Sequence, residues 1–194
     1  MKKHLGWMLV WILGSFPLWG QDLRENQRWI EQIDGGFVFP LSSAASAGYD
    51  HGYGGDILVG YRFDRDFSLS GDIGYYDCDQ RMAGADQGEW IYVPILAMAR
   101  YNFGAGPVRP FLLMGAGVAV NSYALTQGIN AKVSKRETDL MLAPGAGVLF
   151  LVGSGTALYL QARLDLNFST PEGPWTDNPN LFLPVKGGLS FFVL

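Results

Sequence analysis

Several charged residues of this 194-residue chain lie at alternate positions within apolar stretches, a spacing that places them on one face of a strand. They are Asp56, Arg62, Asp72, Arg100, Arg163 and Asp165, with Lys186 in a similar setting. Acids and bases that share a confined interior must pair or stay hydrated, because an unpaired buried charge is costly. We therefore expect a salt-bridged polar network. The alternatives are a gate that rearranges to conduct small ions and a catalytic pair of carboxylates.

Catalysis by a histidine would have to use His51, because His4 lies in an N-terminal segment that we expect to be removed. Ser42, Ser43 and Ser46 precede His51 on the same glycine-containing stretch, which is predicted to be a loop. A nucleophile and its base must be held within hydrogen-bond reach by rigid neighbours. The sequence therefore predicts no enzyme activity.

A metal site would have to use the acidic stretch that contains Asp77, Asp79, Asp86 and Glu89. Calcium prefers several oxygen ligands, but this spacing matches no calcium-binding loop. No glycine-rich segment has the pattern of a phosphate-binding loop. Cys78 is the only cysteine, so no intramolecular disulfide can form. We expect no metal and no cofactor.

The elements that must position these residues are strands, because apolar residues recur at every second position. In residues 158–168 the even positions are all apolar and the odd positions are mostly polar. No stretch after the N-terminal segment reaches the ~18 apolar residues of a membrane helix. We predict eight strands of about 9 to 11 residues each, the length of a tilted membrane strand. They cover residues 34–41, 53–63, 67–76, 91–103, 109–123, 138–152, 158–168 and 181–194.

Tight turns and long connections alternate between these strands. The tight turns lie at residues 64–66, 104–107 and 153–156, and the long polar stretches at about residues 42–52, 77–89, 124–137 and 168–180. Short turns on one side and long loops on the other are typical of an outer-membrane up-and-down barrel. Glycines that alternate with apolar residues, at 115, 117, 145 and 147, predict a narrow lumen in which bulky side chains need room.

The N-terminus predicts secretion. Residues 1–20 contain Lys2 and Lys3, then an apolar core, and end at Gly20, as a signal peptide does; an uncleaved anchor is the alternative. We expect a periplasmic leader at residues 21–33 and a single barrel domain at residues 34–194. Removal of Lys2 and Lys3 leaves 12 basic and 18 acidic residues, a formal charge of −6 that argues against a nucleic-acid partner.

Periodicity does not decide which face of the barrel points outward, because a soluble lipocalin-like calyx buries its apolar face. Aromatic placement favours the membrane: rings cluster at both ends of the strands, where two membrane interfaces would lie. The expected belt beside the tight turns is Tyr61, Phe63, Phe67, Tyr101, Phe103 and Phe111. The expected belt near the long loops is Tyr53, Tyr75, Trp90, Tyr92 and Tyr123.

The chain resembles the small bacterial outer-membrane β-barrels of the OmpA and OmpX type. The similar features are the hairpin that joins residues 59–63 to 67–69, the strand opening Pro110-Phe111, and a C-terminal strand with Lys186 and Gly188 followed by alternating apolar residues. The chain ends at Leu194, whereas the family pattern ends on an aromatic residue. The resemblance implies an all-β, eight-stranded antiparallel up-and-down transmembrane β-barrel in the outer membrane of a diderm bacterium.

Fold alone does not fix function. We expect a non-enzymatic structural or surface-interaction protein that contacts outer-membrane lipids, the barrel-assembly machinery through its C-terminal strand, and an external ligand through four loops. Trp175, between two prolines in the fourth loop, would contact a partner or the outer headgroup layer. The alternatives are a narrow channel for small or apolar solutes and a lipid-modifying enzyme.

The first prediction concerns processing. If residues 1–20 are a signal peptide, the mature chain begins at Gln21, and intact-mass measurement of protein from the membrane fraction will give that N-terminus. A chain that retains Met1 to Gly20 in the membrane would show that the segment is an anchor.

Overall fold

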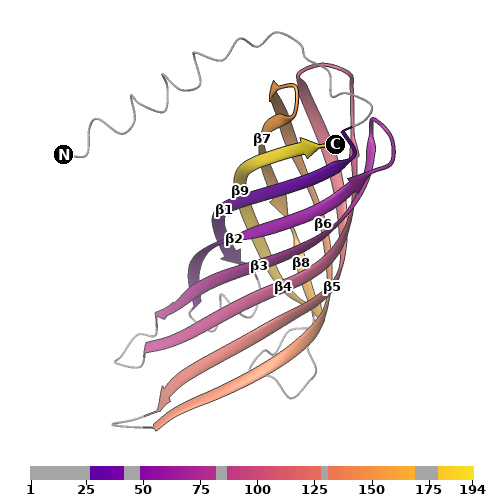
Figure 1. Ribbon diagram of the computed structural model, residues 1–194. Coiled ribbons are helices and arrows are strands. Elements are labelled where there is room, and N and C mark those ends of the chain that lie inside the picture. The colour runs from indigo at the N-terminus through magenta and orange to yellow at the C-terminus, as the bar shows by residue number, and fades with distance from the viewer. Residues whose placement is uncertain (1–26, 42–48, 82–86, 128–130, 169–178) are drawn as a thin grey trace, which may run out of the picture.

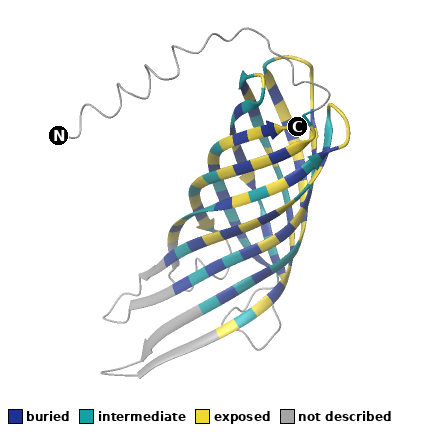
Figure 2. Cartoon of the chain, in the orientation of Figure 1, coloured by how far each residue is buried: buried dark blue, intermediate teal, exposed yellow. Residues whose placement is uncertain are grey.

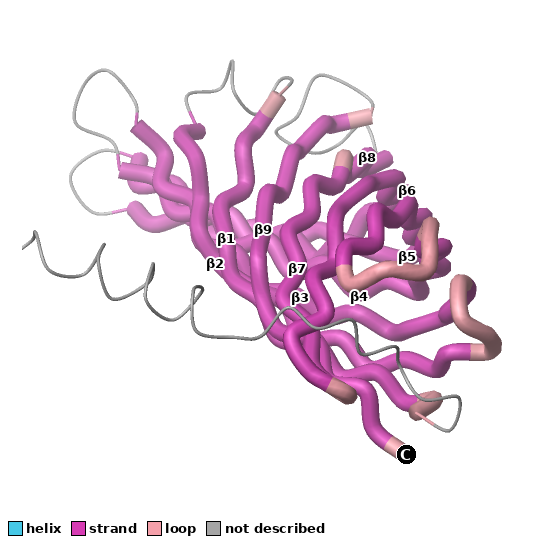
Figure 3. Tube along the Cα trace, turned by 90° about the horizontal axis from the view of Figure 1, so that it is seen from above, coloured by secondary structure: helices cyan, strands magenta, loops and turns pink. Residues whose placement is uncertain are grey.

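The computed structural model describes residues 27–41, 49–81, 87–127, 131–168 and 179–194. These residues form strands joined by short turns (Figure 3). No helix long and apolar enough to cross a membrane occurs among them. The strands are β1 (Trp29–Pro40), β2 (Tyr49–Arg62), β3 (Phe67–Arg81), β4 (Gln87–Asn102), β5 (Val108–Gln127), β6 (Ala131–Gly153), β7 (Thr156–Arg163), β8 (Asp165–Phe168) and β9 (Asn180–Val193).

The strands form one closed antiparallel barrel (Figure 1). Each strand from β1 to β6 pairs with the next, and β7 and β8 both pair with β9. β1 pairs with β9 from Trp29 opposite Val193 to Pro40 opposite Phe182. Closure satisfies the backbone hydrogen bonds that a sheet edge would expose, and the hydrocarbon core of a bilayer requires this. The prediction of an all-β up-and-down barrel is confirmed.

β7 and β8 are two parts of one wall strand, so the barrel has eight strands as predicted. Both parts pair with β6 on one side and with β9 on the other. The interruption at Leu164 lies beside Pro144 of β6, and the Leu164 N–H still donates to the Pro144 carbonyl over 2.8 Å. Proline lacks an N–H, which leaves a gap in a ladder at that position.

Burial alternates along each strand, and the exposed positions form an apolar band around the barrel (Figure 2). In β1, for example, Ile33 and Phe37 are exposed while Gln32 is buried. An apolar exterior around a polar interior is the arrangement of a barrel surrounded by lipid and the opposite of a soluble calyx. The membrane barrel is therefore the correct one of the two predicted alternatives.

Several predicted boundaries are wrong. β1 begins at Trp29, so residues 29–33 belong to the barrel and not to the leader. The strands are also longer than predicted: β3 has 15 residues, β4 has 16, β5 has 20 and β6 has 23, so most of the expected second and third loops are strand. Polar residues misled the prediction, because a hairpin that extends beyond the bilayer need not alternate apolar and polar positions. Residues 1–26, which include the expected signal peptide and the first six residues of the expected leader, lie outside the described residues.

The aromatic belts are only partly as predicted. Tyr53 and Tyr75 are exposed, and so are Phe63, Tyr101 and Phe103. Phe111, Trp90 and Tyr92 point into the lumen, because they share their strand's inward face. The side chain of Tyr123 lies outside the described residues. A belt prediction from proximity to the strand ends fails for aromatic residues that fall on the inward positions.

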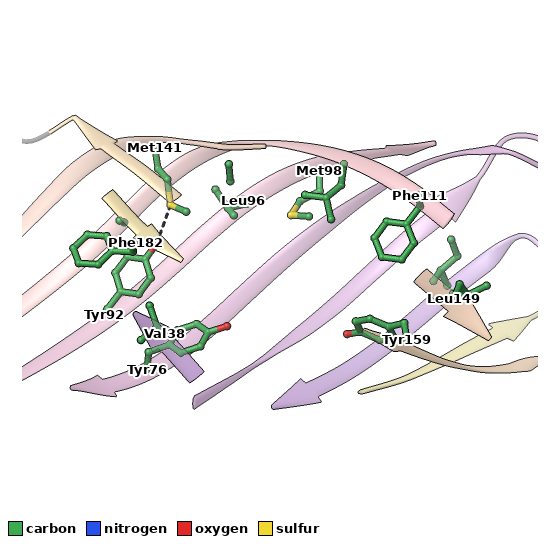
Figure 4. Packing of buried hydrophobic residues seen from close by; sticks show 14 of the residues in the cluster. Val38, Tyr76, Tyr92, Leu96, Met98, Phe111, Met141, Leu149, Tyr159 and Phe182 are labelled. Carbon is green, nitrogen blue, oxygen red and sulfur yellow. Dashed lines mark hydrogen bonds between the residues drawn. The ribbon is translucent and has the colours of Figure 1, made fainter. Parts of the chain in front are cut away.

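The buried hydrophobic side chains form two groups inside the barrel (Figure 4). We call the end with the tight turns the short-turn end and the opposite end the loop end. The group near the loop end contains Tyr76, Trp90, Tyr92 and Phe182, with the Trp90 and Phe182 ring centroids 4.8 Å apart. The other group, which includes Phe111, lies toward the short-turn end. The lumen is therefore packed like a core and contains polar side chains between and beside these two groups.

The short turn between β2 and β3 is closed by a side chain. The Asp64 carboxylate accepts hydrogen bonds from the backbone N–H groups of Asp66 and Phe67 over 2.8 and 2.7 Å. These two bonds lower the pKa of Asp64, because they stabilise its ionised form. The stabilisation is present at neutral pH and is lost as the pH falls through the lowered pKa.

The expected role of glycine in a narrow lumen can be tested on β3. A Cβ at Gly74 would meet the Asp56 carboxylate and lie 2.9 Å from Pro94 Cγ, whereas a Cβ at Gly71, which faces outward, would meet nothing within 4 Å. We expect Gly74→Ala to lower the free energy of unfolding by about 1 to 3 kcal/mol, as overpacking does. Urea unfolding in lipid bilayers, followed by the gel shift between folded and boiled protein, measures it. Gly71→Ala is the matched control, and equal effects of the two variants would contradict the packing argument.

Candidate functional site: a polar network across the lumen

Arg163 lies at the centre of the polar interior and is completely buried. Its Nε donates to Asp165 Oδ1 over 2.6 Å, and its Nη2 donates to Asp165 Oδ2 over 3.1 Å. Its Nη1 donates to Asp72 Oδ2 over 2.7 Å and lies 3.5 Å from Asp56 Oδ2. The paired bonds to Asp165 use the planar fork of the guanidinium, a geometry that Lys could not reproduce.

Lys186 is the second cation of the network and comes from β9. Its Nζ lies 3.2 Å from Asp34 Oδ2 and 3.9 Å from Asp72 Oδ2, and it contacts Asp56 Oδ2 more closely than either. Asp56 and Asp72 thus face both cations. The two cations and their carboxylates form one connected group of charges.

We call this group the ion cluster: Asp34, Asp56, Asp72, Arg163, Asp165 and Lys186. Its members come from β1, β2, β3, β7, β8 and β9, and the Arg163–Asp72 pair joins strands that are not neighbours in the barrel wall. The cluster therefore crosses the lumen and ties together walls that backbone pairing alone does not connect. With four aspartates and two cations, it carries a formal excess of two negative charges.

Two tyrosines join the cluster, and one of them comes from a strand that supplies none of its ions. Tyr92 Oη, from β4, donates to Asp165 Oδ2 over 2.7 Å, and Tyr159 Oη, from β7, donates to Asp34 Oδ2 over 2.5 Å. Hydroxyl donors stabilise carboxylates that have no second cation. The tyrosines thus offset part of the excess negative charge without adding another ion.

Of the six residues predicted to form the lumen network, all are buried, but only four join the ion cluster: Asp56, Asp72, Arg163 and Asp165. Arg62 and Arg100 lie nearer the short-turn end, over the rings of Phe192 and Phe111 at 5.9 and 5.4 Å. Period-two alternation gives the face of a residue correctly. It does not give the height at which two inward residues from different strands meet, since that depends on register.

Asp34, Tyr92 and Tyr159 are cluster partners whose role the sequence did not reveal. Asp34 is the first residue of the predicted barrel, and the neighbouring Gly35 and Gly36 obscure the alternation of apolar and polar residues there. In the structure its Oδ1 accepts a hydrogen bond from the Asp56 backbone N–H over 2.9 Å. Tyr92 was predicted for a membrane belt. The signal that could have found it is its strand: Tyr92 has the same parity as Arg100 on β4.

The other predicted sites have no support among the described residues. His51 is on β2 and not in a loop, and its ring lies 6.3 Å from those of Phe37 and Phe39. Asp77 and Asp79 are on β3. No group of three or more His, Cys, Asp or Glu within the described ranges could hold a metal ion. Trp175, Asp86 and the serines at 42, 43 and 46 lie outside them.

Comparison with known proteins agrees with this architecture. Residues 30–182 match the family described as outer membrane protein beta-barrel domain. None of the curated protein sequences matches the chain. The structure is similar to Neisserial surface protein A, NspA, with a TM-score of 0.62 at 19% identity, covering 84% of this chain and 96% of NspA.

Two further structures are similar at low identity. Ail of Yersinia pestis, in complex with the heparin analogue sucrose octasulfate, gives a TM-score of 0.53 at 14% identity and covers 84% of this chain and 99% of Ail. OprG of Pseudomonas aeruginosa gives 0.54 at 13% identity and covers 89% of this chain and all of OprG (100%). At such identities the likeness concerns the fold alone.

The ion cluster leads to a prediction about stability. Arg163→Gln leaves Asp165 buried without its cation and Asp72 without the closer of its two cations, and we expect it to lower the free energy of unfolding by about 3 to 5 kcal/mol. Urea unfolding in bilayers measures the loss. Arg65→Gln, an exposed arginine that donates to the Ala105 carbonyl at the short-turn end, is the control and should change stability by less than about 0.5 kcal/mol.

A second substitution separates lost charge pairing from lost packing. In the double variant Arg163→Gln, Asp165→Asn, the most closely paired carboxylate is neutral, so part of the lost stability should return. If the single variant is as stable as wild type, the cluster does not hold the barrel together.

Proposed function

The chain belongs to the outer membrane protein beta-barrel domain family, and we propose that it is a closed, non-enzymatic barrel that presents its loop end to the cell exterior for contact with an external ligand. It is a protein of the bacterial outer membrane, where its apolar band contacts lipid. The short-turn end, with both strand termini Trp29 and Val193, then faces the periplasm. This orientation is the usual one for such barrels.

The observation that supports a closed barrel is the inaccessibility of the ion cluster. Arg163 and Asp165 are both 0% exposed, although a side chain that lines a continuous water-filled pore would be accessible to water. The aromatic group with Trp90 and Phe182 packs near the loop end of the lumen, and Tyr92 of this group donates to Asp165 of the cluster. Both features favour a scaffold over a channel.

The same inaccessibility supports a non-enzymatic role. A substrate from either side of the membrane would have to reach Asp56, Asp72 or Asp165, whose charges are already paired with Arg163 and Lys186. The ion pairs of these residues stabilise the barrel. Function is thus assigned to the loop end.

The loop end has an uneven charge that suggests a class of ligand. Lys132, Lys135 and Arg136 lie on the first residues of β6, opposite Thr126, Tyr123 and Ser122 of β5. The neighbouring hairpin is acidic, with Asp79 opposite Glu89. A basic hairpin tip favours a polyanionic ligand such as a sulfated polysaccharide. The Ail complex contains a ligand of this kind. In this chain the basic residues of β6 favour it independently of that likeness.

The C-terminal strand supports a further partner. β9 pairs with β1 to close the barrel, and its outward residues Leu189, Phe191 and Val193 are exposed and apolar. We propose that this strand is recognised by the barrel-assembly machinery before closure, when its edge is still unpaired.

Binding to immobilised heparin tests the external-ligand proposal. Wild-type protein in detergent should bind at low salt and be released at high salt, and the triple variant Lys132→Gln, Lys135→Gln, Arg136→Gln should bind at least about tenfold more weakly. The matched control replaces Asp77, Asp79 and Glu89 by their amides and should bind no more weakly than wild type. Equal binding by wild type and the basic-tip variant would overturn the proposed ligand class.

Planar bilayer conductance tests the closed barrel independently. We expect no steady single-channel current from wild-type protein, because the ion cluster crosses the lumen. Steady current in wild type that changes in Lys186→Met would overturn the scaffold and support the narrow channel.

A further inference from the structure

A second polar layer lies between the ion cluster and the short-turn end. We call it the donor layer: Gln32, Arg62, Ser68, Arg100 and Ser190, all of them buried. Arg62 pairs with Ser68, and Ser68 pairs with Arg100, so these three lie side by side on β2, β3 and β4. Ser190 pairs with Gln32 on β9 and β1. Backbone register therefore places the layer on two stretches of the wall.

Arg100 is a buried cation without a carboxylate partner. No carboxylate of the described residues lies within ion-pair distance of it. Its Nη1 is 3.4 Å from Gln32 Oε1, which is long for a hydrogen bond, and its guanidinium lies over the Phe111 ring. Its Nε has no hydrogen-bond partner. A buried charge in this state is costly unless something compensates it.

The unsatisfied groups near Arg100 are mainly donors. Gln32 Nε2 and Ser190 Oγ are buried and have no hydrogen-bond partner, like Arg100 Nε. Gln32 of β1 reaches Arg100 of β4 through the lumen, because these strands are not neighbours in the wall and yet Gln32 Oε1 lies 3.4 Å from Arg100 Nη1. Arg62 adds a second positive charge two strands away from Arg100. This concentration of donors and positive charge calls for an acceptor with negative charge.

The carboxylates of the ion cluster do not supply this acceptor. Asp34 is the cluster member nearest to Gln32 along β1, and its carboxylate already accepts from Tyr159, from the Asp56 backbone and from Lys186. Asp72 and Asp165 are paired with Arg163. The cluster's excess negative charge acts on Arg100 through space, yet it gives no hydrogen bond to Nε.

We propose that the donor layer binds a small inorganic anion, such as chloride or phosphate, inside the lumen, with Arg100 as its main ligand and Gln32 and Ser190 as further donors. The anion neutralises Arg100 and satisfies donors from β1, β4 and β9. It links opposite walls near the short-turn end, as the ion cluster does farther along the lumen. The barrel should therefore be more stable with the anion than without it.

The test measures the unfolding temperature of purified, folded protein in zwitterionic detergent, by tryptophan fluorescence, during titration with sodium chloride or sodium phosphate. Ionic strength is held constant with sodium gluconate, whose anion is much bulkier. We expect a saturable rise in unfolding temperature with at least one of the two anions. In Arg100→Gln the apparent affinity should fall by about tenfold or more, since a charged hydrogen bond is lost.

Arg65→Gln is the matched control, because it removes an exposed arginine at the same end of the barrel and should leave the titration unchanged. Should Arg100→Gln fail to fold, the Nε–H resonance of Arg100 in wild-type protein gives an independent readout, and we expect it to shift during the same titration. Wild-type protein that shows neither a saturable rise nor a shift overturns the proposal. An equal rise in Arg100→Gln, or its loss in Arg65→Gln, also overturns it.

Discussion

The pairing of Arg163 with Asp72 across the lumen is the interaction on which the rest of the interior depends. Backbone hydrogen bonds close the cylinder of strands, but they run only between neighbours. Arg163 instead connects β7 with β3 through a 2.7 Å bond to Asp72, and Asp165 on its own wall strand holds the guanidinium through a 2.6 Å bond. Because these charges are completely buried, each depends on the others, and removal of one leaves a charge that neither water nor lipid can reach.

This dependence explains how a barrel with an apolar exterior can have a well-defined interior. In a soluble protein the apolar side chains face the interior, whereas in this barrel the outward-facing apolar side chains contact lipid. The inward-facing side chains must fill the lumen. They are charged residues at mid-height and aromatic rings on either side of them along the barrel axis. Glycines make this filling possible, since Gly74 leaves space for the Asp56 carboxylate and Gly147 leaves space for the Phe111 ring.

The sequence was sufficient to predict which side chains point into the lumen, but not which of them contact one another. Alternation placed Asp56, Arg163 and Asp165 inside, because parity is a local property of a strand. Arg100 was grouped with them and lies elsewhere, because the height of a residue depends on strand register and tilt, which are set by all pairings around the barrel. Strand ends were also misjudged: polar residues such as Arg136 and Glu137 suggested a loop, although β5 and β6 continue through them. The sequence therefore predicted most residues of the site, but not which of them form pairs.

Charge is distributed unevenly along the lumen. Carboxylates outnumber cations in the ion cluster, whereas Arg62 and Arg100 bring positive charge toward the short-turn end. Opposite charges in adjacent layers attract even where they form no direct pair, and the low dielectric of a packed lumen strengthens this attraction. The layers thus stabilise one another along the axis while each ties the walls together across it. A barrel braced in both directions supports the β5 and β6 strands, which are longer than the other strands of the wall.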